Sequence, residues 1–418
     1  MKSNQRIIRL IAAILVVVSM LTSLSSCVID FGFYSDLFGS SNSQEEGEQP
    51  GGDGGQNNNG SLNGGIVDDR PAEFYPGSGE GDTENLSALR QTMLSTVSVI
   101  STFKAYPGAG SGVIYSIDKE KGDAYIITNQ HVVYDEEYGL ATTINVFLYG
   151  MELSSYAIPA KFIGGSVTFD IAVLKVEGSE VLKNSYAKAA PIASSDNVRV
   201  FDTVYAVGNP AGYGLAATKG IVSVESENVD ISGADGSEIS LRVIRIDAAV
   251  NGGNSGGGLY DVEGRLVGIV CAKSVGTNID NIGYAIPSDL VRNIVENLLY
   301  HCDGSRVTKL NRALMGITIT AYVTGLVPDG SGDLKEVELV EVVEVANGSL
   351  AAGKVMVGDI VNSITVDGVT KPVTKIHHVT DHMLNARVGS TVSMEITRGT
   401  EKITISFTIT ADRTSLVN

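Results

Sequence analysis

The sequence is poor in positive charge, histidine and cysteine, and it contains no tryptophan. Its 30 lysines and arginines stand against 48 aspartates and glutamates, which gives a formal net charge of −18. No basic patch with interleaved aromatic residues occurs, so we expect no nucleic-acid partner. The absence of tryptophan excludes nothing by itself. A length of 418 residues leaves room for two domains of ordinary size and for unstructured segments.

The scarcity of histidine narrows the search for a catalytic base. Four of the five histidines follow residue 300, and only His131 precedes the glycine-rich stretch NGGNSGGGL at 251–259. Ser255 in that stretch has glycines on both sides, so its hydroxyl can lie exposed on a tight turn beside open backbone N–H groups. Taken alone, such a string also fits a flexible Gly/Asn turn. A serine nucleophile needs a base, usually histidine, and His131 is the candidate.

A histidine base also needs an acid that holds its tautomer. Asp170 begins the strand-like run DIAVLKV at 170–176 and is the candidate. The chain order His131, Asp170, Ser255 is that of the chymotrypsin-type double barrel, and it differs from the order in subtilisins and α/β-hydrolases. The three residues therefore predict acyl-transfer chemistry on a β-rich fold.

Four strings surround these residues: TNQHVV at His131, TFDIAVLKV at Asp170, VGNPAG at 207–212, and DAAVNGGNSGG from Asp247 through Ser255. Together they resemble the HtrA (high-temperature-requirement) family of serine proteases. The resemblance implies an all-β, chymotrypsin-type protease domain of two six-stranded barrels. It also implies an oxyanion hole formed by the N–H groups of Gly253 and Ser255, and neither metal nor cofactor.

The chain departs from the family pattern at two positions. Gly252 and Gly258 stand where family members usually carry proline. Neither change removes a reacting group, but both could loosen the loop that presents the oxyanion donors. We therefore expect an unlocked resting loop.

The pattern of residues from about 89 to 286 supports a barrel or sandwich. Short runs of β-forming residues alternate with Gly, Asn and Asp, which is typical of antiparallel sheets and not of βαβ units. The expected strands are 97–103, 112–117, 124–128, 144–148, 200–207, 239–246 and 266–271. A helix that begins at Pro287-Ser288-Asp289 has apolar residues at helical spacing and closes a protease domain expected over 89–302.

A second compact unit is expected over 312–412, and its succession of strands and glycine turns resembles a PDZ domain of the HtrA type. By that resemblance, the loop formed by Leu314, Met315, Gly316 and Ile317 binds the carboxylate of peptide C-termini. Its apolar side chains favour a hydrophobic last residue in the peptide. Residues near 377–382 would form the helix beside the groove.

The N-terminus predicts export. Residues 1–26 combine a positive start with a short apolar run and end in Leu-Ser-Ser before Cys27, which resembles a lipoprotein signal peptide whose cleavage leaves Cys27 lipidated. The alternative is an uncleaved signal-anchor helix. Residues 27–88 are rich in Gly, Ser, Asn and acidic side chains, which predicts a disordered tether. Both alternatives attach the protein to the membrane outside the cytoplasm.

For two pairs of side chains the sequence leaves two interpretations open. Cys271 and Cys302 form a disulfide or remain two thiols. His378 and His382 have the four-residue spacing of a zinc site on a helix, but no H-E-x-x-H pattern and no third ligand accompany them, so solvated or ligand-facing histidines are the other interpretation.

The sequence thus predicts an extracytoplasmic, membrane-tethered serine endopeptidase. By family resemblance, its substrates are unfolded or damaged polypeptides, its PDZ domain regulates it by binding peptide C-termini, and it is a homotrimer. The alternative is a catalytically idle PDZ adaptor, or a chaperone-like binder of unfolded chains.

Overall fold

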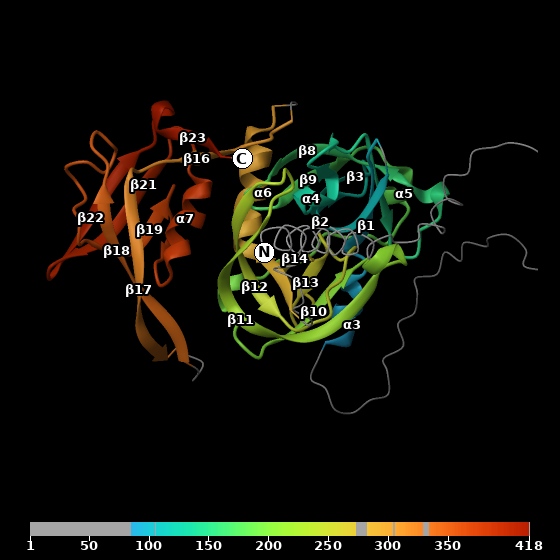
Figure 1. Cartoon of the computed structure of the whole chain (residues 1–418), viewed down its shortest axis with the longest axis horizontal. Helices are drawn as coiled ribbons and strands as arrows, with labels where there is room; N and C mark the ends of the chain where they lie inside the picture. Colours follow the sequence, from blue (N-terminus) through green and yellow to red (C-terminus); the bar gives the residue numbers. More distant parts are fainter. Residues whose placement is uncertain (1–84, 105, 273–281, 304–305, 329–333, 418) are drawn as a thin grey trace, which may run out of the picture. The chain divides into compact units, whose positions relative to one another are not determined.

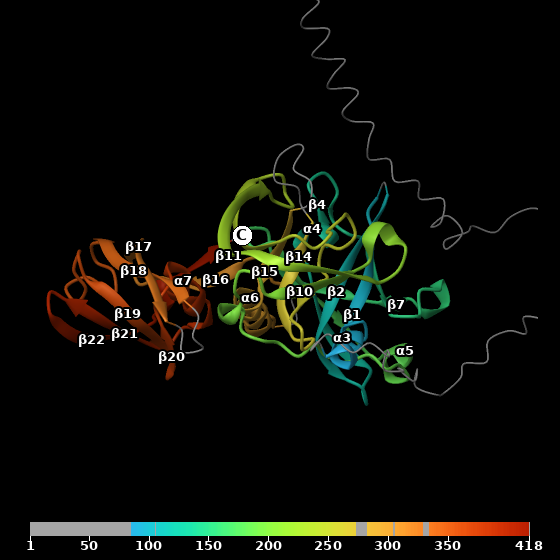
Figure 2. The same cartoon turned by 90° about the horizontal axis from the view of Figure 1, so that it is seen from below.

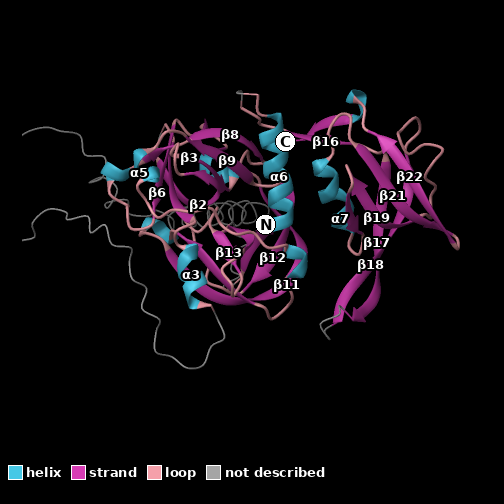
Figure 3. Ribbon diagram, turned by 180° about the vertical axis from the view of Figure 1, so that it is seen from behind, coloured by secondary structure: helices cyan, strands magenta, loops and turns pink. Residues whose placement is uncertain are grey.

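The computed structural model describes residues 85–104, 106–272, 282–303, 306–328 and 334–417. Residues 71–152 and 156–418 belong to one compact unit, and the other unit, residues 1–70 with 153–155, lies almost wholly outside the described residues. The expected signal segment 1–26, Cys27 and most of the tether 27–88 are therefore not described. Among the described residues, no helix is both long and apolar enough to span a membrane. Strands dominate this part of the chain (Figure 3).

The chain enters the fold through helix α3 (Leu86–Thr92), whose first turn is capped by the side chain of Asn85, which accepts the N–H of Ala88. The helix overlaps the last residues of the expected tether, which ends earlier than the composition suggested. The reason is local, because an Asn cap offsets the cost of starting a short helix.

The first sheet has seven strands in the order β7-β6-β1-β2-β3-β9-β8, all paired antiparallel. Figure 1 labels β1, β2, β3, β8 and β9 of this sheet. The prediction of six strands here is corrected to seven, because a two-residue strand, β7, pairs with β6. The bounds are β1 Thr96–Thr102, β2 Pro107–Asp118, β3 Asp123–Thr128, β6 Thr143–Leu148, β7 Ile158–Pro159, β8 Lys161–Ser166 and β9 Ile171–Val176. Short elements between them are α4 Gln130–Val133, β4 Tyr134–Asp135, β5 Gly139–Leu140, η1 Ser154–Tyr156 and α5 Glu180–Lys183.

The second sheet closes into the predicted six-stranded barrel, in the order β10-β11-β12-β15-β14-β13. Figure 2 shows the long strand β11 curving around it. Every residue of β14 and β15 is buried. Their sequences are therefore continuous apolar runs without alternating polar residues. The bounds are β10 Thr203–Gly208, β11 Ala216–Ser232, β12 Glu238–Ile246, β13 Gly258–Tyr260, β14 Leu266–Cys271 and β15 Gly283–Pro287, with η2 Ser195–Asn197 and η3 Pro210–Gly212. Helix α6 (Ser288–His301) follows and buries an apolar face that includes Leu290, Ile294 and Leu298.

Residues 310–417, called the C-terminal body below, have a core of their own. Its main sheet has the order β17-β18-β19-β21-β22, with β20 paired to β19, and β16 pairs separately with β23. The bounds are β16 Leu310–Ala313, β17 Ile317–Pro328, β18 Leu334–Val345, β19 Ile360–Val366, β20 Val369–Pro372, α7 Ile376–His382, η4 Met383–Asn385, β21 Thr391–Arg398, β22 Glu401–Thr408, η5 Ala411–Arg413 and β23 Thr414–Val417. Helix α7 lies where the sequence predicted a helix, near residues 377–382.

Candidate active site

The loop before β13 holds Ser255 in a conformation that only glycine neighbours allow. Gly253 has φ +96°, and a Cβ there would lie 2.2 Å from the carbonyl oxygen of Asn209. Gly256 has φ +85°, and a Cβ would lie 2.1 Å from the carbonyl oxygen of Ser111. Both positions therefore exclude any side chain. Ser255 itself is largely buried, with 5% of its surface exposed.

Paired strands bring His131 and Asp170 together. His131 lies in the single turn α4 directly after β3, Asp170 directly precedes β9, and β3 pairs with β9. One carboxylate oxygen of Asp170 accepts the His131 backbone N–H at 3.0 Å, and the other lies 2.7 Å from His131 Nδ1. Asp170 is fully buried. This geometry holds the ring in the tautomer that leaves Nε2 free to act as a base.

Asp170 has φ +49°, a left-handed conformation that costs of order 1–3 kcal/mol in a residue other than glycine. Its carbonyl oxygen accepts the Gln130 N–H at 3.2 Å and the Asn129 side-chain amide at 2.9 Å. These bonds fix the strained residue beside His131. The strain therefore lies beside the candidate base, and backbone strain of this kind clusters at active sites.

Ser255 and His131 line one cavity of about 330 Å³, together with Gly252, Gly253 and Ala272. The Ser255 Oγ accepts the backbone N–H of Ala272 at 3.2 Å, at the end of β14. The three residues predicted from sequence therefore meet at one site, although they come from different sheets. The Oγ retains its own proton for donation to a base.

The expected oxyanion loop is clamped from two sides, which corrects the unlocked loop expected from Gly252 and Gly258. The N–H of Ala211 in η3 donates to the Gly252 carbonyl at 2.8 Å, so in this trans peptide the Gly253 N–H points the opposite way. The Ser111 Oγ donates to the Gly253 carbonyl at 2.7 Å and accepts the Asn209 N–H at 2.7 Å. Sequence reasoning missed Ser111. The only hint of its role in the sequence was a serine between two glycines, in what is now β2. The string VGNPAG, which contains its partner Asn209, was used only as part of the family resemblance.

The two glycine departures have different surroundings. At Gly252 a Cβ would meet no atom within 4 Å. At Gly258 a Cβ would lie 2.3 Å from the ring of Tyr260, which is completely buried and bonded through its hydroxyl to Thr96 at 2.9 Å. The Tyr260 ring therefore occupies the space that a side chain at position 258 would need.

Cys271 and Cys302 are not joined to each other, so of the two alternatives left open by the sequence the two thiols hold. The physical reason is their separation onto β14 and the end of α6. Cys271 instead directs its thiol at the catalytic candidate Asp170, with Sγ 3.6 Å from Oδ2.

The loop expected to bind carboxylates, Leu314 to Ile317, joins β16 to β17. Gly316 has φ +78°, and a Cβ there would lie 2.2 Å from the Cβ of Ser349, so only glycine fits. Met315 is buried and Leu314 is exposed. Strand β17 stands at the end of the strand order among the described residues, with α7 packed near it.

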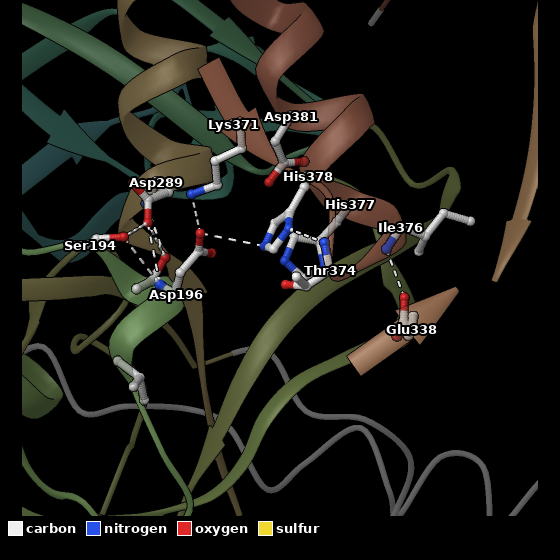
Figure 4. A network of polar contacts seen from close by, with 12 residues as sticks. Ser194, Asp196, Asp289, Glu338, Lys371, Thr374, Ile376, His377, His378 and Asp381 are labelled. Carbon is white, nitrogen blue, oxygen red and sulfur yellow. Dashed lines mark hydrogen bonds and ion pairs between the residues drawn. The ribbon is translucent and has the colours of Figure 1, made fainter. Parts of the chain in front are cut away.

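The spacing of His378 and His382 suggested a shared zinc site, but His378 lies instead in a polar cluster with His377 and Asp196 (Figure 4). His378 Nε2 lies 3.4 Å from an Asp196 carboxylate oxygen, while its Nδ1 accepts the Thr374 N–H at 3.2 Å. His382 Nε2 lies 2.8 Å from the carbonyl oxygen of Val369. The two histidines have separate partners and do not converge on one ion.

Charges around this cluster shift its pKa values. Burial alone would raise the pKa of Asp196, but hydrogen bonds from His378 and Lys371 outweigh burial and hold that pKa below its usual range. Burial and the nearby charge of Arg242 lower the pKa of His377 to about 2. Arg242 is itself paired with Asp381. Asp196, His377 and His378 have ligand atoms within 4.8 Å of one another, but Lys371 already occupies the Asp196 carboxylate.

Comparisons with known proteins point in the same direction as the geometry. Residues 110–269 match the family model of the trypsin-like peptidase domain. The chain is 42% identical over 195 residues to the serine protease Do-like HtrA of Bacillus subtilis, covering 46% of this chain and 39% of that protein. It is 30% identical over 312 residues to the periplasmic pH-dependent serine endoprotease DegQ of Escherichia coli, covering 74% and 61%.

Among solved structures, the HtrA-type protease AlgW with tripeptide aligns with a TM-score of 0.50 at 24% identity, covering 80% of this chain and 97% of that one. That likeness bears on the fold alone. The first curated relatives are matched over only 39% to 47% of their own length.

Proposed function

We propose that this chain is a trypsin-like serine protease of the HtrA family and that it hydrolyses peptide bonds through an acyl-enzyme formed on Ser255. The observation that carries the proposal is the buried Asp170 carboxylate, which holds His131 by two contacts, of 3.0 and 2.7 Å, beside the cavity that Ser255 also lines. An oriented imidazole and a serine between glycines are the two groups that acyl transfer requires.

The mechanism follows from these contacts. His131 takes the Ser255 proton as Oγ attacks the substrate carbonyl, and later gives a proton to the leaving amine. Asp170 keeps Nδ1 protonated and stabilises the imidazolium. The N–H groups of Gly253 and Ser255 stabilise the oxyanion, and the clamp by Ser111 and Ala211 supports that role.

The test is cleavage of a denatured protein by the full chain. Ser255→Ala, His131→Ala and Asp170→Asn are each expected to abolish cleavage without unfolding the chain, and a double variant is expected to be no slower than the slowest single one, because the three groups act as a unit. Undiminished cleavage by Ser255→Ala would refute the assignment. Binding of unfolded chains by a protein that never cleaves them would instead favour the adaptor or chaperone-like alternative.

The substrates we propose are unfolded or damaged polypeptides outside the cytoplasm, and the protein acts there in quality control. The family resemblance supports this proposal, as does the export signal read in residues 1–26. The resemblance also supports a homotrimer. Sedimentation of the purified chain measures this directly, and a monomer at working concentration would contradict it.

We further propose that the C-terminal body acts as a PDZ domain that binds peptide C-termini and raises the rate at Ser255. Support comes from the strand β17 at the end of its sheet, available for a peptide to add as a further strand, and from the glycine-dependent turn at Gly316 that precedes it. Couplings between such sites are typically about 1–3 kcal/mol, or roughly 5- to 150-fold in rate or affinity.

The test compares one peptide with a free, apolar C-terminus and the same peptide amidated. The free peptide is expected to bind and to accelerate cleavage, and the amidated peptide is expected to do neither. Equal binding of both would refute carboxylate recognition. Binding without any change in rate would refute regulation and leave a tether for substrates.

A further inference from the structure

The thiol of Cys271 contacts the Asp170–His131 pair, and the proposed mechanism gives this thiol no role. Its Sγ is 3.6 Å from Asp170 Oδ2, the same oxygen that lies 2.7 Å from His131 Nδ1. Cys271 is 2% exposed and Asp170 is fully buried. The imidazole nitrogen, the carboxylate oxygen and the sulfur all lie within 4.8 Å of one another.

These three groups are of the types that bind Zn²⁺ in proteins. Thiolate, imidazole and carboxylate are the three protein ligand types of Zn²⁺, and sites with three protein ligands keep a fourth position for water. Tetrahedral bonds of ordinary length put a sulfur and an oxygen ligand about 3.5 Å apart, and a nitrogen and an oxygen about 3.3 Å apart. The observed 3.6 Å between Cys271 and Asp170 already fits, and the 2.7 Å between His131 and Asp170 has to open only slightly.

The charge around the site suits a cation. The adjoining cavity is lined by His131 and by Asp135, and no lysine or arginine is among its described lining residues. His131 retains 21% exposure of its side chain, so an ion can approach past its ring. The cluster around Asp196 is different, because Lys371 already neutralises that carboxylate and Arg242 lies beside His377.

We infer that Cys271, Asp170 and His131 bind a thiophilic divalent cation, Zn²⁺ in the first instance, and that this ion switches hydrolysis off. On binding, the thiol of Cys271 loses its proton to solvent and the Nδ1 proton of His131 moves to Nε2. Two anionic ligands then neutralise the dication, which a buried site favours. With Nε2 protonated, His131 has no lone pair to accept the Ser255 proton, and the nucleophile stays inactive.

The inhibitory half of this inference rests on the proposed function, whereas the binding half does not. The experiment therefore begins with binding, measured on the full chain carrying Ser255→Ala by Zn²⁺ calorimetry and by the ultraviolet thiolate absorbance that Cd²⁺ induces. Adding Cys271→Ser is expected to remove the absorbance and to weaken Zn²⁺ by about 100-fold or more, because even outer partners of ligands account for about 10- to 100-fold. Cys302→Ser is the matched control and is expected to retain both signals. Unchanged affinity in Cys271→Ser would overturn the site.

Inhibition is then measured with Ser255 intact, and each variant is compared with its own rate in the presence of a chelator. Zn²⁺ is expected to inhibit the wild-type chain and Cys302→Ser reversibly, and to inhibit Cys271→Ser far less. Equal inhibition of all three, or Zn²⁺ binding at Cys271 with no loss of rate, would overturn the inhibitory role. If no cleavage occurs even with chelator, the proposed function fails while the binding result stands.

Discussion

At the scale of single residues, the site depends on groups that bear no reacting atom. Ser111 is completely buried and joins the Gly253 carbonyl to the Asn209 N–H. It therefore ties the oxyanion loop before β13 to the loop after β10. Both of its partners are backbone groups, so removing the hydroxyl leaves the buried Asn209 N–H and the part-buried Gly253 carbonyl without this partner.

Ser111→Ala is expected to lower kcat by about 10-fold with little change in KM, since outright loss of an oxyanion donor costs about 100- to 1,000-fold and repositioning costs less. Unsatisfied buried groups should also lower the free energy of unfolding by about 1–3 kcal/mol. Steady-state kinetics and urea unfolding measure the two effects.

Ser98→Ala is the matched control for Ser111→Ala. Ser98 is also buried in a neighbouring strand, but its Oγ has no hydrogen-bond partner within the described part of the chain. The control is expected to keep its activity. Equal losses in the two variants would mean that the Ser111 bonds do not position the loop.

Gly258 and Tyr260 form a second pair at this scale. Gly258→Ala is expected to cost about 1–3 kcal/mol of unfolding free energy, because the new Cβ meets the rigid, buried Tyr260 ring. In a Tyr260→Leu background the same change should be nearly neutral, since leucine lacks the ring atoms that collide. A double-mutant cycle by urea unfolding measures the coupling. Additive losses would show that the ring does not explain glycine at position 258.

Some residues of the site could be predicted from the sequence, and others could not. His131, Asp170 and Ser255 were predicted because each is a chemical type that catalysis requires, in a chain order that one fold uses. Ser111 and the thiol contact of Cys271 were not predicted, because both depend on which strands face each other across two sheets. The histidine spacing left a zinc site open, and the structure speaks against it, since His378 contacts Asp196 and His382 contacts the Val369 carbonyl.

At the scale of elements, the longer strands and the closed six-stranded barrel were predicted from the sequence, whereas the number of strands in the first sheet was not. The run predicted at 266–271 is β14, and the run predicted at 144–148 lies within β6. The seventh strand of the first sheet has only two residues, too few to give a periodic signal. Helix α3 depends on a single capping residue, Asn85, inside a segment whose composition favours disorder.

Helix α7 is expected to make stability depend on pH. His377 has a pKa of about 2 in the folded chain against 6.5 for the free group, mainly because it is buried and also because Arg242 is near. Between pH 6.5 and about 2 the unfolded chain therefore binds more protons, so folded stability falls as pH decreases through that window. The contribution is fully present above pH 6.5.

His377→Gln should remove this dependence, which amounts to at most about 1.4 kcal/mol per pH unit. Urea unfolding at several pH values below neutrality measures the slope in each protein. The variant is expected to lose less stability on acidification than the wild type. Parallel slopes would show that His377 takes up its proton without unfolding.

At the scale of the whole molecule, we expect the N-terminal segment to set where the protein acts. We predict that Cys27 carries lipid and is the mature N-terminus, because a positive start and a short apolar run end at Leu-Ser-Ser-Cys. Cys27→Ala is expected to release the protein from the membrane fraction or to mislocalise it. Mass spectrometry of the membrane fraction provides the check, and an unmodified Met1 there would contradict the prediction.

The central claim at this scale is that the two sheets and the glycine loop assemble a working serine nucleophile. Labelling with a serine-reactive fluorophosphonate tests it most directly, on the full chain with chelator present and with an apolar, free C-terminal peptide added. We predict one label per chain, mapped to Ser255, absent in Ser255→Ala and strongly reduced in His131→Ala. A chain that stays unlabelled under these conditions, or a label that persists in Ser255→Ala, would contradict the account.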